Sequence, residues 1–311
     1  MMRIPVSRLF STVAMAIGLL AANVAAASPY SGFYVFGDSL SDSGNIYATT
    51  SGSLPPSPYF NGRFSNGPTY AEDLAGRYGF AAAPSLLGGT NYAFGGATAG
   101  GAAMAIPSLG DQVSMFRAKP GAADSSALYV VWAGGNDLRA DPSPVGIGSA
   151  LGGISGAIQG LYQEGARNFL VMNLPNLGLT PEAQANGTVA AATAGSMIFN
   201  SYFNSTIGGL QGALAGSNIR TLDTFALLSG IVANPVAAGL GNVTNACFNG
   251  TSVCSNPDSY LFWDGIHPTA AGHRLIADAA FNVLAVPEPE TYALMLAGMG
   301  LLALRMRRRH R

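Results

Sequence analysis

The sequence predicts an α/β fold in which a mostly parallel sheet carries helices on both faces, that is, a three-layer α/β/α sandwich. Short apolar runs alternate along the chain with longer segments of helical character, which is the pattern of repeated βαβ units. Two of these runs stop abruptly at glycine and polar residues, after Phe36 and after Ala133. Buried parallel strands end in this way where their carboxyl ends reach a ligand.

The expected elements alternate in chain order. Short apolar runs predict strands at 33–36, 127–133, 169–174 and 219–225. The segments between and after them predict helices at 69–78, 149–165, 181–214 and 270–284. The third of these helices is rich in alanine and begins with Pro181, which suits a first helical turn.

Residues 1–27 are expected to be a secretory signal peptide. Arg3 and Arg8 precede an apolar core at 13–20, and small residues at 25–27 stand where a cleavage site is expected. The apolar core is too short to span a membrane stably. We therefore expect the protein to be exported.

The other end of the chain is also expected to lie outside the fold. The sequence Val286-Pro287-Glu288-Pro289 precedes an apolar stretch at 292–304, and an arginine-rich segment ends the chain. This leaves residues 28–285 as one domain, which is long enough to bury a full hydrophobic core.

The charge of this domain argues against one class of partner. Residues 28–285 contain eight Lys and Arg against fourteen Asp and Glu, a net charge of −6, whereas the whole chain has a net charge of −1. An acidic domain without a basic stripe is a poor candidate for nucleic-acid binding.

Ser39 is the candidate nucleophile. It follows the first apolar run in the sequence Phe36-Gly37-Asp38-Ser39, so a buried strand would deliver it to a loop at the carboxyl edge of the sheet. The alternative is a plain strand-to-turn junction, in which Asp38 and Ser39 bond to their own backbone.

Two glycine-containing stretches follow. The segment 89–97 contains the doublet Gly95-Gly96, which would let a backbone N–H approach a ligand closely. It lacks the spacing of a dinucleotide-binding loop, and no cofactor is expected. Asn136 follows the strand at 127–133 and is either a site residue at the same sheet edge or a turn asparagine.

The loop 58–68 is rich in aromatic residues and turn formers. Its aromatic side chains either pack back onto the domain or line a pocket, and the sequence leaves both interpretations open.

A serine nucleophile needs a base, and residues 28–285 contain only His267 and His273. Pro268 restrains His267 to an extended or turn conformation before the last helix. Asp264 precedes His267 by three residues and can accept its Nδ1–H, which leaves Nε2 free to take the serine proton. His273 lies inside the helix and is expected to be a surface or capping residue.

Cys247 and Cys254 are the only cysteines of the chain. In an exported protein this close pair predicts a disulfide that clips one loop. A metal or redox pair is the alternative, but it lacks the Cys-x-x-Cys spacing and a nearby histidine.

Four blocks of the sequence resemble the motifs of the GDSL, or SGNH, family of serine esterases and lipases. They span most of residues 28–285 and read Phe36-Gly37-Asp38-Ser39-Leu40-Ser41, Gly89-Thr90-Asn91-Tyr92-Ala93-Phe94-Gly95-Gly96, Gly134-Gly135-Asn136-Asp137 and Asp264-Gly265-Ile266-His267. The resemblance implies the flavodoxin-like sheet of the SGNH hydrolase fold. The G-x-S-x-G elbow of ordinary α/β-hydrolases is absent, because Ser41 stands where its second glycine would be.

The resemblance also implies roles for individual residues. Ser39 would be the nucleophile, His267 the base and Asp264 its orienting carboxylate. The oxyanion hole would consist of the backbone N–H groups of Ser39 and Gly96 and the side-chain amide of Asn136. No metal or cofactor is implied.

The glycine doublet leaves a choice between Gly95 and Gly96 for the second oxyanion donor. Gly96 is preferred, because it lies five residues after Asn91, as the family's pattern suggests.

The C-terminal segment 286–311 resembles the PEP-CTERM sorting signal of Gram-negative bacteria that produce exopolysaccharide. This implies that export machinery and a sorting or processing protease are partners. The protein would lie in the periplasm, at the cell surface or in the extracellular matrix after transient anchoring in the inner membrane. A plain C-terminal membrane anchor is the alternative.

These observations favour a secreted hydrolase that cleaves carboxylic esters through an acyl-enzyme intermediate. Lipid, aryl and O-acetylated sugar esters all remain open as substrates. A catalytically silent carbohydrate-binding or extracellular-matrix protein on the same fold is the alternative function.

Overall fold

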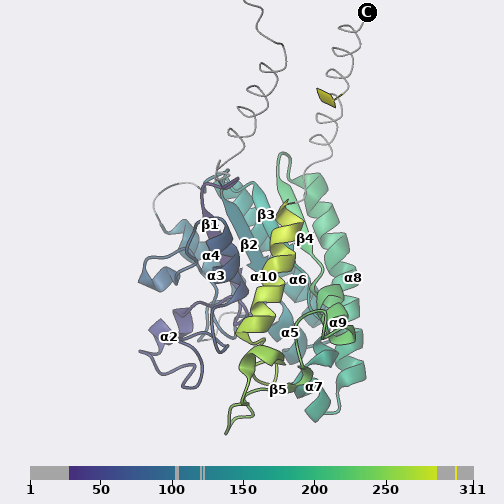
Figure 1. Cartoon of the computed structure of the whole chain (residues 1–311). Helices are drawn as coiled ribbons and strands as arrows, with labels where there is room; N and C mark the ends of the chain where they lie inside the picture. Colours follow the sequence, from purple (N-terminus) through teal and green to yellow (C-terminus); the bar gives the residue numbers. More distant parts are fainter. Residues whose placement is uncertain (1–27, 102–104, 120, 122, 286–297, 300–311) are drawn as a thin grey trace, which may run out of the picture.

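The computed structural model of the chain describes residues 28–101, 105–119, 121, 123–285 and 298–299 (Figure 1). The expected signal peptide at 1–27 lies outside the described residues. The expected sorting signal at 286–311 also lies outside them, except for residues 298–299. Among the residues that the structure describes, no helix is long and apolar enough to cross a membrane.

A four-stranded parallel sheet forms the centre of the domain, which confirms the predicted fold class. Its strands are β1 (Phe33–Gly37), β2 (Leu128–Trp132), β3 (Asn168–Met172) and β4 (Asn218–Leu222), and they lie side by side in this order. Each neighbouring pair is parallel. The carboxyl ends of all four strands therefore meet at one edge of the sheet.

The segment around Asn91 extends the sheet on the free side of β1. The N–H of Val35 donates to the carbonyl of Thr90 (3.2 Å), and the N–H of Tyr92 donates to the carbonyl of Val35 (2.7 Å). The chain therefore passes from β1 to this outer segment and then back to β2 on the other side of β1. This is the flavodoxin-like order, and ligands of such sheets bind where the direction reverses, here at the carboxyl ends of β1 and β2.

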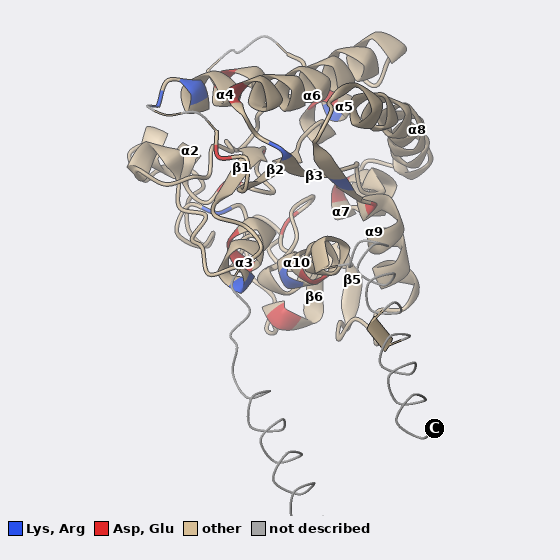
Figure 2. Cartoon of the chain, turned by 90° about the horizontal axis from the view of Figure 1, so that it is seen from above, with Lys and Arg blue, Asp and Glu red and all other residues tan. Residues whose placement is uncertain are grey.

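Helices cover both faces of the sheet (Figure 2). One layer contains α4 (Leu109–Arg117), α6 (Pro144–Glu164) and α8 (Val189–Ala213), and the other contains α3 (Tyr70–Arg77) and α10 (Ala270–Ala285). Along β2, Tyr129 and Val131 face the first layer, whereas Leu128, Val130 and Trp132 face the second. All five side chains are buried, so this strand is a continuous apolar run.

The predicted helix at 181–214 is wrong as a single element. The structure divides it into α7 (Pro181–Ala185) and α8, because Gly187 adopts a left-handed conformation (φ 68°) and the N–H of Thr188 bonds back to the carbonyl of Ala183 (2.9 Å). The predicted strand at 219–225 also ends early. Asp223 instead caps helix α9 (Thr224–Ala233) by accepting the N–H of Ala226 (3.0 Å).

Several short elements were not predicted. They are α2 (Asn45–Thr49), α4, α5 (Gly135–Ala140) and α9, the two strands of the second sheet described below, and the 3₁₀ turns Ser85–Leu87, Leu177–Leu179 and Pro257–Ser259. Helix α4 begins with a capping box, in which Ser108 and Asp111 exchange hydrogen bonds. This Ser-x-x-Asp spacing is the sequence signal that would have located α4.

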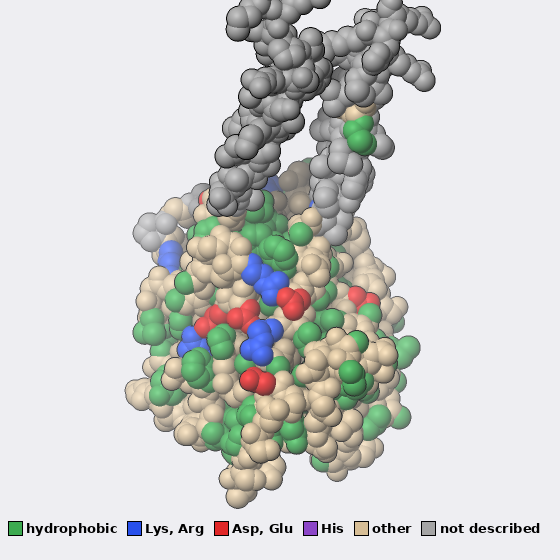
Figure 3. All heavy atoms as spheres, viewed as in Figure 1, with side chains coloured by type: hydrophobic (Ala, Val, Ile, Leu, Met, Phe, Trp, Pro, Cys, Tyr) green, Lys and Arg blue, Asp and Glu red, His purple; other side chains and the backbone are tan. Residues whose placement is uncertain are grey.

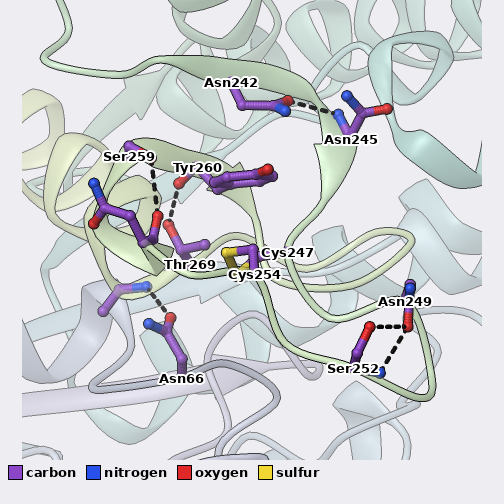
Figure 4. Close-up of a disulfide and its surroundings, with 12 residues drawn as sticks. Asn66, Asn242, Asn245, Cys247, Asn249, Ser252, Cys254, Ser259, Tyr260 and Thr269 are labelled. Carbon is purple, nitrogen blue, oxygen red and sulfur yellow. Dashed lines mark hydrogen bonds between the residues drawn. A yellow bond between two sulfur atoms is a disulfide. The ribbon is translucent and has the colours of Figure 1, made fainter.

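A second, two-stranded parallel sheet consists of β5 (Asn242–Ala246) and β6 (Tyr260–Phe262). Helix α9 packs against it through Ile231, which lies in one apolar cluster with Val243 and Leu261. The loop between β5 and β6 holds the Cys247–Cys254 disulfide (Figure 4). This sheet leads directly into the segment that contains Asp264 and His267.

Charged side chains of both signs lie next to one another on the face that α3 and α10 cover (Figure 3). Arg77 of α3 forms an ion pair with Asp278 of α10, and Nη2 of Arg274 lies 3.7 Å from Oδ1 of Asp258. The surface of this face is therefore of mixed charge.

Candidate active site

Ser39 lies two residues beyond β1, in a turn that its own backbone closes. The carbonyl of Asp38 accepts the N–H groups of Ser41 and Asp42 (both 3.0 Å), and the Asp38 carboxylate accepts the N–H of Leu40 (3.0 Å). Gly37 is required at the end of the strand, because a Cβ there would lie 2.3 Å from the carbonyl oxygen of Trp132. The turn therefore presents Ser39 at the carboxyl edge of β1.

The structure brings Ser39, His267 and Asp264 together in a hydrogen-bonded row. The Oγ of Ser39 lies 2.8 Å from Nε2 of His267, and Nδ1 of His267 lies 2.7 Å from Oδ2 of Asp264. Ser39 and His267 are 228 residues apart in the chain. The hydroxyl of Ser39 thus bonds to the imidazole, whereas Asp38 bonds to the backbone of its own turn, as the alternative interpretation expected.

Asp264 is held by a tight turn of its own segment. Its Oδ1 accepts the backbone N–H groups of Ile266 (2.9 Å) and His267 (2.7 Å), while Oδ2 faces the imidazole. Burial would raise the pKa of Asp264, but the hydrogen bonds from His267 and Ile266 and the charge of His267 outweigh burial and lower it to about 2. Asp264 is therefore a carboxylate at neutral pH.

Of the three residues expected to supply oxyanion donors, two line one cavity and Gly96 is not among its lining residues. Ser39 and Asn136 line one cavity together with His267. The Nδ2 of Asn136 donates to the carbonyl of Ala97 (2.9 Å), which uses one of its two amide protons and fixes the side chain beside the glycine doublet. Among the residues that the structure describes, none accepts the second amide proton.

The two glycines of the doublet differ in their hydrogen bonding. The N–H of Gly95 donates to Oδ2 of Asp42 (2.8 Å), so this donor is already used. Gly96 is exposed and adopts a left-handed conformation (φ 81°), which favours glycine at this position. The N–H of Gly95 is therefore occupied by a carboxylate, and Gly96 as the second donor stays a prediction.

Two buried carboxylates fix the loop that carries the doublet. Asp42 accepts the N–H of Gly95 and also those of Gly44, Asn45 and Ile46 at the start of α2. Asp137 accepts the N–H groups of Ala99 (2.8 Å) and Gly100 (2.9 Å). Sequence reasoning missed both roles, although each aspartate lies within or next to one of the four motif blocks.

Gln112 is a further residue that sequence reasoning missed. From helix α4, its side chain accepts the N–H of Gly37 (2.9 Å) and donates to the carbonyl of the same residue (2.8 Å). This pair of bonds fixes the last residue of β1, immediately before the Ser39 turn. No sequence pattern around Gln112 indicated the contact, which joins residues 75 positions apart.

Asp38 is a buried acidic group beside the candidate nucleophile. Burial raises its pKa to about 6, although the N–H of Leu40 and the charge of His267 act in the opposite direction. The side chain of Asp38 lines the same cavity as Ser39 and His267.

His273 is buried, so of its two expected roles the surface position is wrong and the capping role is confirmed, at a neighbouring helix. Its Nδ1 accepts the N–H of Tyr70, the first residue of α3, at 3.2 Å, and therefore caps a neighbouring helix. Burial, and to a lesser extent the charge of His267, lowers the pKa of His273 from 6.5 to about 3. The structure thus separates the two histidines: one contacts Ser39, and the other supports helix packing.

The cavity beside Ser39 is mostly apolar. It contains about 800 Å³ of space free of protein atoms, a volume that includes space open to solvent. Its apolar wall comes from α9, β6 and α10, through Leu227, Leu228, Ile231, Leu261, Phe262 and Ile276. Arg139 lies at the cavity and forms two hydrogen bonds with Glu182.

The aromatic loop at 58–68 packs behind the row of site residues. The ring of Phe64 lies 5.3 Å from the His267 ring, and the hydroxyl of Tyr59 donates to Oδ2 of Asp264 (2.7 Å). The sequence left open whether these aromatic side chains pack onto the domain or line a pocket. Phe64 and Tyr59 pack onto the domain, against His267 and Asp264.

The Cys247–Cys254 disulfide supports the segment just before Asp264. The N–H of Cys247 donates to the carbonyl of Phe262 (3.0 Å), and the N–H of Phe248 donates to the carbonyl of Trp263 (2.6 Å).

In the part of the chain that the structure describes, no group of three or more His, Cys, Asp or Glu side chains is arranged to hold a metal ion.

Comparison with known proteins identifies the family. The model of the GDSL-like lipase/acylhydrolase family matches residues 33–280. The chain belongs to this family. The match includes all four motif blocks and the whole sheet, and members of the family act on ester bonds. A second model, the PEP-CTERM protein-sorting motif, matches residues 285–309.

Three relatives illustrate the range of this GDSL family. Phosphatidylcholine-sterol acyltransferase of Aeromonas hydrophila is 27% identical, and the match covers 85% of this chain and 94% of the relative. Esterase EstA of Pseudomonas aeruginosa is 31% identical, and the match covers 85% of this chain and 48% of the relative. An uncharacterized protein of the trpE-trpG intergenic region of Pseudomonas putida is 32% identical, and the match covers 85% of this chain and 50% of the relative. The chain spans about half the length of the last two.

Proposed function

We propose that this GDSL-family protein is a serine esterase in which Ser39 is the nucleophile, His267 the general base and Asp264 the carboxylate that orients the imidazole. The observation that carries the proposal is the row of short contacts, 2.8 Å from Ser39 to His267 and 2.7 Å from His267 to Asp264. A hydroxyl becomes a strong nucleophile when a base accepts its proton and a third group fixes that base.

The reaction would proceed in two steps. The Oγ of Ser39 attacks the ester carbonyl while its proton passes to Nε2 of His267. The bond to the alcohol then breaks, and His267 returns the proton to the departing alkoxide, which leaves an acyl group on Ser39. In the second step a water molecule attacks this acyl group and gives its proton to His267. The carboxylic acid departs, and the proton returns to Ser39.

Negative charge develops on the carbonyl oxygen in both steps. The backbone N–H groups of Ser39 and Gly96 and the Nδ2 of Asn136 would stabilise it as fixed donors. The hydrogen bond from Asn136 to the Ala97 carbonyl supports this assignment, because it holds the amide in place before the substrate arrives.

The apolar cavity supports an ester with an apolar acyl or alcohol part as the substrate. Such a substrate would bury its chain against α9, β6 and α10 while its carbonyl lies at Ser39. An alcohol in place of water in the second step would make the protein an acyltransferase, and the Aeromonas hydrophila relative carries that name.

For the cellular context, we propose export through the signal peptide at 1–27 and anchoring through residues 286–311. The match of the PEP-CTERM motif to residues 285–309 supports a C-terminal sorting signal and a protease that reads it. On this proposal the catalytic domain at 28–285 acts outside the inner membrane of a Gram-negative bacterium.

A direct assay tests the proposal. The purified protein should hydrolyse p-nitrophenyl butyrate, and Ser39→Ala should lose the activity while retaining the circular dichroism spectrum of the wild type. Hydrolysis by Ser39→Ala at more than a few per cent of the wild-type rate would place the nucleophile elsewhere. Absence of turnover by the wild type on aryl, lipid and acetylated-sugar esters would favour the silent binding protein instead.

A further inference from the structure

Tyr59 contributes a hydrogen bond to the site from a distant part of the chain. Its hydroxyl donates to Oδ2 of Asp264 at 2.7 Å across 205 residues of sequence. The same oxygen also lies 2.7 Å from Nδ1 of His267, whose N–H it accepts. Within the described part of the chain, the remaining partners of Asp264 are the backbone N–H groups of its own turn, at Oδ1. Tyr59 is thus the partner that comes from outside the 264–267 segment.

The ring of Tyr59 is half-buried and contacts three aromatic neighbours. It makes edge contacts with Phe64 (6.3 Å between ring centroids), Phe248 (5.8 Å) and Trp263 (6.1 Å). Phe248 follows Cys247 of the disulfide, and Phe64 contacts the His267 ring. The hydroxyl therefore has little freedom to leave the carboxylate.

The hydroxyl also remains protonated at any pH where an esterase works. Burial, followed by the negative charge of Asp264 and the hydrogen bond to it, raises the pKa of Tyr59 above its usual range. Tyr59 is therefore a constant donor to the carboxylate and does not compete with His267 for the role of base.

We propose that Tyr59 is a positioning residue that acts through Asp264: its hydroxyl fixes the carboxylate oxygen that holds His267 and withdraws negative charge from it. The inference rests on the proposed function. Its consequence concerns the protonated form of His267, which a more negative carboxylate would stabilise. Loss of the Tyr59 hydroxyl should therefore change the acid limb of the pH–rate profile, which makes that limb the readout for its role.

Two other titratable groups face His267, and both remain in a Tyr59 variant. Asp38 lies in the same cavity and interacts with the charge of His267 from the β1 side, and His273 does so from α10. A difference between the pH profiles of wild type and variant therefore reports on the Tyr59 hydroxyl and not on these groups.

The first test is Tyr59→Phe, which removes only the hydroxyl. We expect kcat/KM for p-nitrophenyl butyrate to fall roughly tenfold, mostly through kcat, because a hydrogen bond to a charged group is lost. We also expect the acid limb of the kcat/KM profile to move upward by about half to one pH unit. The matched control is Tyr162→Phe in α6. This variant also loses one hydrogen bond, from the tyrosine hydroxyl to the carbonyl of Ala215 (2.8 Å). The control should retain both the rate and the profile.

The second test keeps the hydroxyl and changes its strength. Replacement of Tyr59 by 3-fluorotyrosine makes a stronger donor in nearly the same volume, and the acid limb should then move to lower pH. A merely structural role would not move the limb in opposite directions in the two proteins. This test also decides the question if Tyr59→Phe fails to fold.

An acid limb that stays in place in both proteins would overturn the role of Tyr59. The result is separable from the proposed function, because activity that survives Ser39→Ala contradicts the esterase mechanism whatever Tyr59 does. An inactive Ser39→Ala variant together with unchanged profiles in both Tyr59 proteins would contradict the Tyr59 inference alone.

Discussion

Replacement of His273 should separate stability from catalysis. His273 is buried, and its Nδ1 accepts the N–H of Tyr70 at the start of α3. His273→Ala would leave this donor unpartnered, at a cost of about 1–3 kcal/mol, and would open a cavity as well. We expect the free energy of unfolding at pH 8 to fall by about 2–4 kcal/mol in total, with kcat close to the wild-type value.

The pH dependence of stability gives a sharper form of the same prediction. The pKa of His273 falls from 6.5 to about 3 on folding, so between these values the unfolded state binds a proton that the folded state does not. The contribution of His273 to stability is therefore complete above pH 6.5 and decreases as the pH falls toward 3. Between pH 8 and pH 5 the loss is about 2 kcal/mol.

Urea unfolding at pH 8 and pH 5 measures this contribution. His273→Asn removes the titrating group but retains a carbonyl oxygen that can accept the N–H of Tyr70, so it should be more stable than His273→Ala at pH 8. Between pH 8 and pH 5, the free energy of unfolding of both variants should fall by about 2 kcal/mol less than that of the wild type. Equal losses in all three proteins, or an inactive but stable His273→Ala, would refute this reasoning.

Three further predictions concern the oxyanion donor, the cavity and the disulfide. Asn136→Ala should lower kcat roughly 10²–10³-fold with little change in KM, because one fixed donor is lost, and a reduction of less than about twofold would exclude the role. Leu228→Trp fills part of the apolar cavity and should reduce the rate with p-nitrophenyl octanoate more than with the acetate; an equal effect on both would remove the cavity from substrate binding. Replacing Cys247 and Cys254 together by alanine should lower the free energy of unfolding by at most about 2–3 kcal/mol, and mass spectrometry that finds two free thiols in the exported wild type would refute the bridge.

The central strands and the order of the motif blocks could be predicted from the sequence for a physical reason. A strand buried on both faces must be apolar at every position, as in β2, and this makes it visible as a short run. The residues at the ends of such runs then gather at one edge, so Ser39 and Asn136 could be assigned to a common site before the structure was known.

The parts that escaped prediction depend on contacts between distant segments. The bonds from Tyr59 to Asp264 and from Gln112 to Gly37 join residues 205 and 75 positions apart, and no local pattern encodes either one. The same holds for His273, whose burial follows from the packing of α10 against α3. The break between α7 and α8 was in principle visible as Asn186-Gly187 within an alanine-rich segment.

The most direct test of the proposed chemistry is covalent labelling by a fluorophosphonate, which reacts with an activated serine. If Ser39 is the nucleophile, mass spectrometry will find a single label on each molecule, on the peptide that contains Ser39, and ester hydrolysis will be lost in proportion to labelling. Ser39→Ala will take up no label, and His267→Ala will react far more slowly. A label on Ser41 or Ser43, or hydrolysis that continues after Ser39 is fully labelled, would contradict the assignment of the nucleophile.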